Sequence, residues 1–441
     1  MKVVILTPDR NPRLAYTLDF INQHPLIKGQ VFFSFEEHGA DIPINYSSQG
    51  DINLQIPRQG LLFIDAEVSS YHCNAYTHEN ETYYSVEAQR RPKQKAVSDK
   101  QLAFDVFESI FYHISRYEEV KADPSQNYQA GWLNEEEHVL VKYGLEKEPI
   151  VDRLIVLLKS YLLNKKEEGS KSTYALSHDI DILYRFKPWY KIPRSILAIV
   201  YHRRGLIHLI KTKWHILLML LGIHKDPYDT FHFLLDKEGP YTQKRLYLMS
   251  GGETRHDNLY SIHDRKVERI IQDATFKGYT IGLHPSIHAS FKAELRNKEL
   301  SLLSKVARKE VVLSRQHWLM WYWDKTPALL DHSQIVEDSS MGYSKRLGFR
   351  CGTGFPYHLY DFNKEAAYAW KERPLAFMDS ALIHESRRLK QTPTEICAYF
   401  FKANAAGTHI EMNWHNSNFD PTTKYGQELR TIYTKLDQYL S

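Results

Sequence analysis

The alternation of short apolar segments with helix-like segments along the second half is the feature that most limits the folds open to this chain. Val267, Ile270, Ile271 and Ala274 recur at helical spacing, which predicts a helix over Asp264–Phe276 that Gly278 ends. The predicted strands around it are Thr173–Ser177, Arg245–Ser250, Tyr279–His284, Val311–Ser314 and Thr408–Trp414. Such alternation favours a parallel sheet or barrel, whose functional groups gather at the carboxyl ends of the strands.

The first part of the chain predicts a smaller mixed α/β domain over residues 1–165. Its predicted strands are Val3–Leu6, Gln30–Phe35 and Leu61–Asp65. One helix is predicted to begin at the N-cap Ser98 and to carry apolar residues from Ala103 to Tyr117, and another to run from Pro149 to Leu163. Asn164–Ser172 has no large apolar residue, so we expect the boundary there and a second domain over residues 173–441.

Composition places the chain among soluble globular proteins. Of its 441 residues, 43% are hydrophobic and 25% are charged, which excludes a disordered, collagen-like or coiled-coil protein. The 57 basic and 53 acidic side chains leave a formal net charge of +4. This near balance gives no reason to expect a nucleic-acid partner.

The cysteines and the apolar runs predict a compartment. Cys73, Cys351 and Cys397 are odd in number and widely separated, which argues against a disulfide framework and fits a reducing environment. The apolar run Val3–Leu6 is too short for a secretory signal. The longest apolar block, Ile216–Ile223, is far shorter than the roughly 20 residues that span a membrane. We therefore expect a soluble, cytoplasmic protein.

One stretch departs from the average charge. Between Asp181 and Asp226 the chain has no acidic residue but nine basic ones, interspersed with apolar residues such as Trp189 and Leu217–Leu221. We expect a basic helical insertion at about residues 185–240. It could contact an anionic membrane surface or a phosphate-bearing ligand, or it could pack on the domain with its basic side in water.

Two aspartates follow the predicted strand Thr173–Ser177. Asp179 and Asp181, in Ser-His-Asp-Ile-Asp, can converge on one site if the chain turns there. One carboxylate can then bind a metal while the other accepts a proton. Because Asp-x-Asp is also common in ordinary turns, the pair alone does not establish a site.

Two histidines lie at the end of the predicted strand Tyr279–His284. His284 and His288, in His-Pro-Ser-Ile-His, face the same way at metal-chelating separation if the segment is helical, and Pro285 suits a first helical turn. With 22 histidines in the chain, such a pair also arises by chance.

The combination of these motifs points to a catalytic metal site. One aspartate and two histidines give three protein ligands and leave a position for water, whose pKa the metal lowers. The second aspartate can remove the proton of that water. His415, close to the end of the last predicted strand, is placed to protonate a leaving group.

The order of the motifs resembles the polysaccharide deacetylase superfamily, the carbohydrate esterases with a NodB-homology domain. The resemblance covers roughly Thr173 to Ser441 and rests on the two motifs above, on Arg315-Gln316-His317-Trp318 and on a late Trp-His-Asn. It is nearest to a divergent bacterial branch with an N-terminal companion domain. The resemblance implies a distorted (β/α) barrel that binds a divalent metal, often zinc.

The resemblance also implies roles for single residues. Asp179 matches the catalytic base, and Arg315 matches the arginine that orients this base. Asp181, His284 and His288 match the three metal ligands. In this sequence one residue separates the two aspartates, which are adjacent in most of the superfamily.

Two further roles follow from the resemblance. His415 matches the general acid, and a backbone amide near Trp318 would help to hold the oxyanion. Arg-Gln-His-Trp stands where Arg-Pro-Pro-Tyr is usual, and Asn-Trp-His where Leu-x-His is usual, so the groove floor is expected to differ. His178, at a usually aromatic position, could support the site or simply fill space.

We therefore expect a metal-dependent hydrolase, with zinc as the expected cofactor, that removes N-acetyl groups from an amino-sugar-containing glycan or glycan precursor. Two alternatives stay open: a hydrolase of another non-peptide linear or cyclic amide, and a catalytically inactive glycan-binding protein. Since many members of the superfamily act on extracellular glycan, a cytoplasmic protein would act on a precursor, such as a lipid-linked one. The basic insertion would then approach the membrane.

Overall fold

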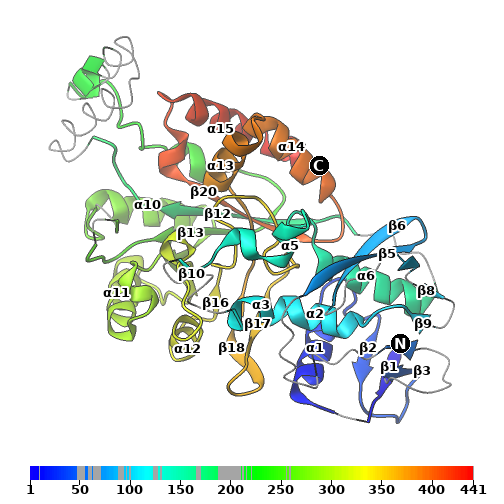
Figure 1. The fold of residues 1–441 in the computed structure, drawn as a ribbon. Coiled ribbons are helices and arrows are strands. Elements are labelled where there is room, and N and C mark those ends of the chain that lie inside the picture. The colour runs from blue at the N-terminus through cyan, green and yellow to red at the C-terminus, as the bar shows by residue number, and fades with distance from the viewer. Residues whose placement is uncertain are drawn as a thin grey trace. The chain divides into compact units, whose positions relative to one another are not determined.

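The computed structural model is a mixed α/β structure (Figure 1). It describes residues 1–440 except 9, 47–54, 58–61, 63–70, 88–93, 96, 99–100, 123–127, 130–131, 165–169, 187–209, 211–212, 215, 220, 255 and 258–259. The chain divides into two compact units, each built from segments far apart in sequence. Unit 1 comprises Met1–Ala175, Trp318–Phe377 and Phe400–Met412, and unit 2 comprises Leu176–His317, Met378–Tyr399 and Asn413–Ser441.

The largest sheet within unit 1 has six strands in the order β2-β1-β3-β4-β9-β8. β1 pairs in parallel with β2 on one side and β3 on the other, so its apolar residues are enclosed. A hairpin of β5 and β6 forms a second sheet with β7, and β10 pairs with β11. The strands are β1 (Lys2–Leu6), β2 (Phe32–Ser34), β3 (Ile42–Tyr46), β4 (Gln55–Ile56), β5 (His72–His78), β6 (Glu81–Glu87), β7 (Gln94–Lys95), β8 (Val97–Ser98), β9 (Gln101–Leu102), β10 (Tyr128–Gln129) and β11 (Trp132–Leu133).

The helix α2 (Val106–Ile114) lies at the core of unit 1. All of its residues are buried, and it packs against α1 (Pro12–Gln23) and α6 (Ile150–Leu163). Asp105 caps it, because its side chain accepts a hydrogen bond from the Glu108 backbone N–H at 3.0 Å. The remaining helices of the first 170 residues are α3 (Tyr117–Val120), α5 (Val139–Lys142) and the 3-10 turn η1 (Glu135–Glu137).

Residues 318–377 complete unit 1. Arg350 Nε donates to Glu119 Oε1 at 3.0 Å, across 231 positions of sequence, and both side chains are buried. Residues 318–377 therefore belong to the same compact unit as the first 175 residues. The elements of this segment are α12 (Thr326–Asp331), β16 (Glu337–Asp338), β17 (Tyr357–Asp361) and β18 (Ala366–Glu372).

The longest sheet has nine strands in the order β17-β18-β16-β15-β14-β13-β12-β20-β19. β14 pairs in parallel with β13 and with β15, as the alternation of strands and helices predicts. Among the described residues this order has two free ends, so these nine strands form an open half-barrel. The strands not yet placed are β12 (Thr173–Ile180), β13 (Tyr241–Leu248), β14 (Tyr279–Leu283), β15 (Leu313–Ser314), β19 (Leu375–Met378) and β20 (His409–His415).

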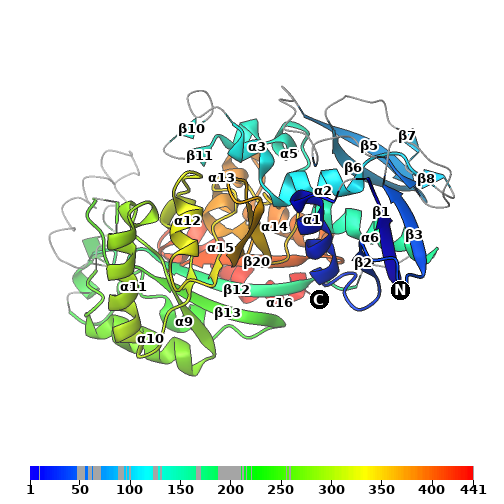
Figure 2. The same cartoon turned by 90° about the horizontal axis from the view of Figure 1, so that it is seen from below.

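Two helices of unit 2, α10 (Arg265–Phe276) and α11 (Ala293–Ala307), contact β14 and each other. Figure 2 shows both helices. α10 begins after Asp264, whose side chain accepts from the Lys266 backbone N–H at 2.8 Å, and Gly278 follows it with φ +79°. The other elements are α9 (Phe231–Leu235), α13 (Asp379–Leu389), α14 (Pro393–Ala403), α15 (Lys424–Thr434), α16 (Leu436–Leu440), η2 (His288–Ser290), η3 (His317–Leu319) and η4 (Asn416–Phe419).

Most of the predicted elements are confirmed, and two helix starts are wrong. The predicted strands and helices that correspond to β1, β2, α6, α10, β14, β15 and β20 are present near their expected bounds. Ser98 does not start a helix: it ends β8, and α2 begins later because Asp105 provides the cap. The segment after His284 is not a helix either, since only a short 3-10 turn forms at His288–Ser290.

Two predictions fall largely outside the described residues. These are the strand Leu61–Asp65, of which Leu62 is described and lies in a turn, and most of the insertion at residues 185–240. In the part of the chain that the structure describes, no helix combines the length and apolar character needed to cross a membrane.

Candidate active site

β12 sets the two aspartates on the same side. Successive residues of a strand point to opposite faces, so Ser177 and Asp179 share a face, and Asp181 continues that spacing just beyond the strand end. His178 lies on the opposite face, where its Nε2 is 3.3 Å from the Tyr433 hydroxyl. Burial lowers the pKa of His178 to about 3. His178 therefore packs as a neutral ring away from the aspartates.

Asp179 is a buried carboxylate held by two donors. Arg315 Nη1 donates to its Oδ1 at 2.9 Å, and Asn413 Nδ2 donates to its Oδ2 at 2.7 Å. Burial alone would raise the pKa of Asp179, but the charges of Arg315 and of the neighbouring histidines outweigh it and lower the pKa. Asp179 is therefore ionised at neutral pH and able to accept a proton.

Asp181, His284 and His317 form a group whose candidate ligand atoms all lie within 4.8 Å of one another. His284 follows β14 and His317 follows β15, so the two rings come from neighbouring strand ends, with centroids 5.1 Å apart. One carboxylate oxygen and two imidazole nitrogens are a ligand set that zinc takes in catalytic sites. We call these three residues the cation cluster.

The contact between His284 and Asp181 supports a cation in this cluster. His284 Nδ1 lies 2.6 Å from the Arg315 carbonyl oxygen, so the proton of the neutral ring sits on Nδ1 and the Nε2 lone pair is left open. Nε2 lies 3.1 Å from Asp181 Oδ1, a buried oxygen without a hydrogen bond among the described residues. Two acceptors this close repel each other unless they share a proton or a bound cation.

The shifts in pKa agree with this geometry. Burial favours the neutral forms of both groups, but the two opposite charges outweigh it. The pKa of His284 is raised by Asp179 and Asp181, and that of Asp181 is lowered well below its usual range by His284. The cluster therefore attracts positive charge, and its donor atoms fit a divalent metal.

His288 lies outside the cation cluster. Its Nδ1 is 3.2 Å from Glu253 Oε2, and the side chain is 35% exposed. The expected helical spacing with His284 does not exist, so the two rings do not share a helical face. The structure brings Asp181 and His284 together as the sequence predicts, and it adds His317 where His288 was expected.

Asp257 supports the cation cluster from the loop after β13. Its Oδ2 accepts from the backbone N–H of Thr254 at 2.6 Å, and its Oδ1 accepts from that of Ile287 at 2.9 Å. Oδ1 also lies 3.9 Å from His317 Nδ1. Burial alone would raise the pKa of Asp257, but His317 and these N–H groups lower it well below its usual range. A fixed carboxylate beside a ligand histidine sets the orientation of the ring.

His415 faces both aspartates from the end of β20. Its Nε2 lies 3.9 Å from Asp179 Oδ2 and 3.8 Å from Asp181 Oδ2. Its Nδ1 lies 2.7 Å from Oδ1 of the buried Asp379, which begins α13. Burial lowers the pKa of His415, but Asp379 and the two aspartates outweigh it and raise it to about 10. The ring is therefore protonated at neutral pH and presents Nε2–H toward the site.

Arg315 is fully buried and has a fixed position. Its Nη1 also donates to Ser177 Oγ at 2.9 Å, and its guanidinium lies 4.4 Å from the centre of the Tyr247 ring. After His317 the backbone enters the left-handed region, with φ +57° at Trp318 and +54° at Leu319. Trp318 belongs to unit 1, so the role expected for its backbone amide stays a prediction.

Several residues of the site were not chosen from the sequence. His317 stands in the Arg-Gln-His-Trp motif, but no spacing rule links it to His284. Asp257 and Asp379 lie far from every motif, and only the fold brings them to His317 and His415. Asn413 is two residues before His415 on the same strand, so the alternation of strand faces could have identified it.

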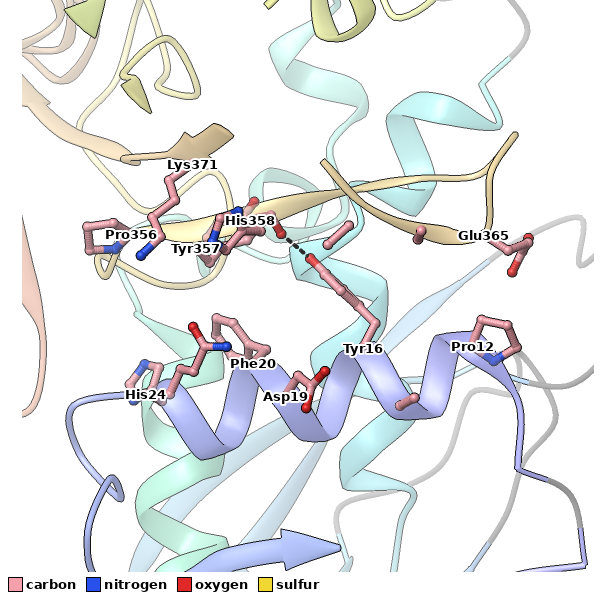
Figure 3. Close-up of a pocket in the computed structure, with 14 residues that line it drawn as sticks. Pro12, Tyr16, Asp19, Phe20, His24, Pro356, Tyr357, His358, Glu365 and Lys371 are labelled. Atoms are coloured by element: carbon pink, nitrogen blue, oxygen red, sulfur yellow. Dashed lines mark hydrogen bonds between the residues drawn. The ribbon is translucent and has the colours of Figure 1, made fainter. Parts of the chain in front are cut away.

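Unit 1 has a pocket of its own, of about 320 Å³, between α1 and the strands β17 and β18 (Figure 3). Its walls include the rings of Tyr16, Phe20 and Tyr357, and the Tyr16 hydroxyl donates to the His358 carbonyl oxygen at 2.7 Å. Lys371 and the exposed Asp19 also line it. None of the residues of the candidate active site contributes to these walls.

Comparison with known proteins gives a family of unknown function for the first part of the chain and two weak structural similarities. Residues 3–167 match the family DUF7033. A predicted polysaccharide deacetylase from Mycobacterium smegmatis is 16% identical, with 61% of this chain and 85% of that chain covered and a TM-score of 0.33. A predicted polysaccharide deacetylase involved in O-antigen biosynthesis, from Bordetella bronchiseptica, is 12% identical, with coverages of 63% and 88% and a TM-score of 0.28. No curated protein shows significant similarity.

Proposed function

We propose that this chain is a metal-dependent hydrolase that removes an N-acetyl group from an amino-sugar-containing glycan or glycan precursor. The observation that carries the proposal is the meeting of a buried base, a protonated imidazole and a three-residue cation cluster at the ends of β12, β14, β15 and β20. Each of these groups has a distinct task in the hydrolysis of an amide.

Asp181, His284 and His317 would hold the cation. A divalent metal bound there supplies Lewis-acid polarisation of the acetyl carbonyl and lowers the pKa of water, and zinc suits the ligand set. His284 is prepared for this role, because the Arg315 carbonyl fixes its tautomer.

Asp179 would act as the general base. Arg315 and Asn413 hold its two oxygens and keep it ionised, so that it can take the proton of the attacking water. A carboxylate has further lone pairs beyond the two that these donors occupy.

His415 would act as the general acid. Its Nε2–H faces the two aspartates, while Asp379 anchors the other nitrogen. Delivery of this proton to the departing amine completes the cleavage, because an unprotonated amine anion is a very poor leaving group.

The substrate class rests on the motif resemblance, and the assay must therefore test it directly. The purified protein is stripped with a chelator, reloaded with zinc, and assayed for acetate release from N-acetylglucosamine oligomers. Linear primary amides are assayed for ammonia release, and cyclic amides for ring opening. We expect zinc-dependent acetate release. Ring opening or ammonia release without acetate release would favour a hydrolase of another cyclic or linear amide. Sugar binding without turnover under any divalent metal would favour a binding protein.

The ligand assignment has its own test. Asp181→Ala and His284→Ala should each lose bound metal, measured by elemental analysis of the dialysed protein. Unchanged metal content in both variants would remove the cation cluster from the proposal.

A further inference from the structure

Exposed large apolar side chains concentrate in one short segment of unit 2. Among the described residues, thirteen large hydrophobic side chains are exposed, and five of them fall within 14 positions. These five are Ile210 (58% exposed), Trp214 (61%), Leu217 (44%), Leu221 (63%) and Ile223 (65%). The other eight are scattered between Met1 and Tyr399, which is the ordinary condition of a protein surface.

The first four of these residues have the spacing of one helical face. Ile210, Trp214, Leu217 and Leu221 stand at positions i, i+4, i+7 and i+11. Within residues 210–219, those that the structure describes have helical backbone. Ile216, which lies off this face, is buried at 6% exposure. The apolar stripe is therefore exposed to solvent, whereas Ile216, on another side of the same turns, is covered.

The stripe has a defined end. Gly222 adopts φ +73°, and the backbone N–H of Ile223 donates to the Leu218 carbonyl at 2.9 Å, the closing bond of a helix that stops at a left-handed residue. Ile223, directly after Gly222, is a further exposed apolar residue at this end of the segment. We call Ile210, Trp214, Leu217, Leu221 and Ile223 the apolar stripe.

The charged residues along the sequence from 182 to 225 all have one sign. From residue 182 to residue 225 the sequence has nine basic residues and no acidic one. Arg185 is paired with Asp420, whereas Lys213 and Lys225, which flank the apolar stripe, are exposed to solvent. A basic surface with apolar residues fits a partner that offers both anionic groups and an apolar phase.

We propose that the apolar stripe and its flanking lysines dock on the surface of an anionic lipid bilayer. A soluble phosphate compound would satisfy the lysines but leave five apolar side chains in water. A bilayer surface satisfies both, because Trp and Leu enter the boundary of the acyl chains while lysine stays among the headgroups. This inference is independent of the proposed reaction, since it concerns only where the protein is located.

The test is co-sedimentation of the full chain with vesicles of phosphatidylcholine alone and of phosphatidylcholine mixed with phosphatidylglycerol. We expect binding to the mixed vesicles that weakens as salt is raised. Trp214→Glu and Leu217→Glu should each lower the partition coefficient by about tenfold or more, and Lys213→Glu should lower it only for the mixed vesicles. Phe276→Glu is the matched control, because Phe276 is 90% exposed on α10, outside the apolar stripe, and its loss should leave binding unchanged.

Three results would overturn the proposal. These are the absence of binding to mixed vesicles, an equal effect of Phe276→Glu and Trp214→Glu, and a dimer in analytical ultracentrifugation that Trp214→Glu converts to a monomer. The last result would mean that a second copy of this chain covers the apolar stripe. Circular dichroism of each variant distinguishes a loss of binding from a loss of folding. We expect every variant to fold, because the substituted side chains are exposed.

Discussion

At the scale of single residues, the identity of the second ligand histidine decides how the site is built. His317 belongs to the cation cluster, and Asp257 lies beside its ring, whereas His288 faces Glu253 and is partly exposed. The two histidines therefore differ in their surroundings although both lie near His284 in sequence or in space. A pair of variants can separate them.

His317→Ala should weaken zinc binding by at least about 100-fold, because it removes one of three protein ligands, whereas loss of a supporting group alone costs about 10- to 100-fold. His288→Ala, the matched control, should leave zinc affinity within about twofold. Competition with a chromophoric chelator measures both affinities. The reverse pattern, with His288 needed and His317 dispensable, would restore the ligand set predicted from the motif.

Asp379 gives a prediction about pH dependence. The pKa of His415 is raised to about 10, so its proton is available below that pH and is lost as the pH rises through it. Burial lowers the pKa of His415, and the charge of Asp379 is the main effect that raises it. Asp379→Asn removes this charge, so the pKa of His415 should fall. The alkaline limb of kcat/KM should then move to lower pH by about one to three units.

The control for Asp379→Asn is Glu395→Gln, which changes another acidic residue in the first turn of a helix without contact to His415. Its pH profile should match that of the wild type. An unmoved alkaline limb in Asp379→Asn would show that His415 is not the group that titrates there.

Part of the site could be predicted from the sequence because strands impose short-range order. Asp179 and Asp181 meet because residues two apart on a strand share a face, and this follows from local geometry alone. His284 and His415 could be identified because each lies at the end of an apolar segment. Asp257 and Asp379 could not be found in this way, since nothing local marks a carboxylate that reaches its partner through the fold.

At the scale of elements, α2 shows why helix bounds are hard to predict. Apolar residues continue upstream of the helix, and Ser98 is a good N-cap by composition, yet β8 and β9 pair with each other through Ser98 and Gln101. This segment therefore forms β8 and β9 instead of a helical turn, and the helix starts at the next capping residue, Asp105. Local preference identified the helix, whereas the pairing of β8 with β9 and the cap at Asp105 set its first residue.

The same helix predicts a dependence of stability on pH. His113 lies in the last turn of α2, fully buried, and burial lowers its pKa to about 3, although Glu118 opposes this. The unfolded chain takes up a proton at this histidine near pH 6.5, whereas the folded protein does not. The stability contributed by the neutral ring is therefore complete above about pH 6.5 and is lost as the pH falls toward 3.

His113→Leu should reduce this loss, with a gain relative to the wild type of up to about 3 kcal/mol at pH 4. The free energy of unfolding in urea, measured between pH 4 and pH 8, tests the prediction. Substitution of the exposed His38 by Gln should leave the profile unchanged. A parallel shift of the whole His113→Leu curve, with no change in slope, would contradict the account.

At the scale of the whole molecule, a buried ion cluster joins segments of unit 1 that are distant in sequence. Glu119 accepts from Arg350 and from Arg116, and all three side chains are buried. Burial alone would raise the pKa of Glu119, but the two guanidinium groups outweigh it and lower it. Because a buried charge without its partner is costly, the cluster makes the two segments depend on each other.

Arg350→Leu should therefore destabilise the protein by about 3 to 5 kcal/mol, because Glu119 loses one of its buried partners. Arg153→Ala is the matched control, since Arg153 forms an ion pair with Glu148 at 2.7 Å in the same unit but is 42% exposed. Its cost should stay below about 1 kcal/mol. Thermal and urea unfolding of the full chain measure the loss of stability in both variants. An equal loss would show that the buried Glu119 cluster stabilises the protein no more than an exposed ion pair does.

The distance between Glu119 and Arg350 along the chain also has a consequence for biosynthesis. Arg116 is synthesised just before Glu119, but the ribosome must add another 231 residues after Glu119 before the second partner, Arg350, exists. At about 5 to 20 residues per second, the nascent amino-terminal segment waits roughly 10 to 50 s with only one of the two guanidinium partners of Glu119 in place. Co-translational folding of this segment should thus stay incomplete until Arg350 emerges from the ribosome. During that interval a chaperone could bind the segment.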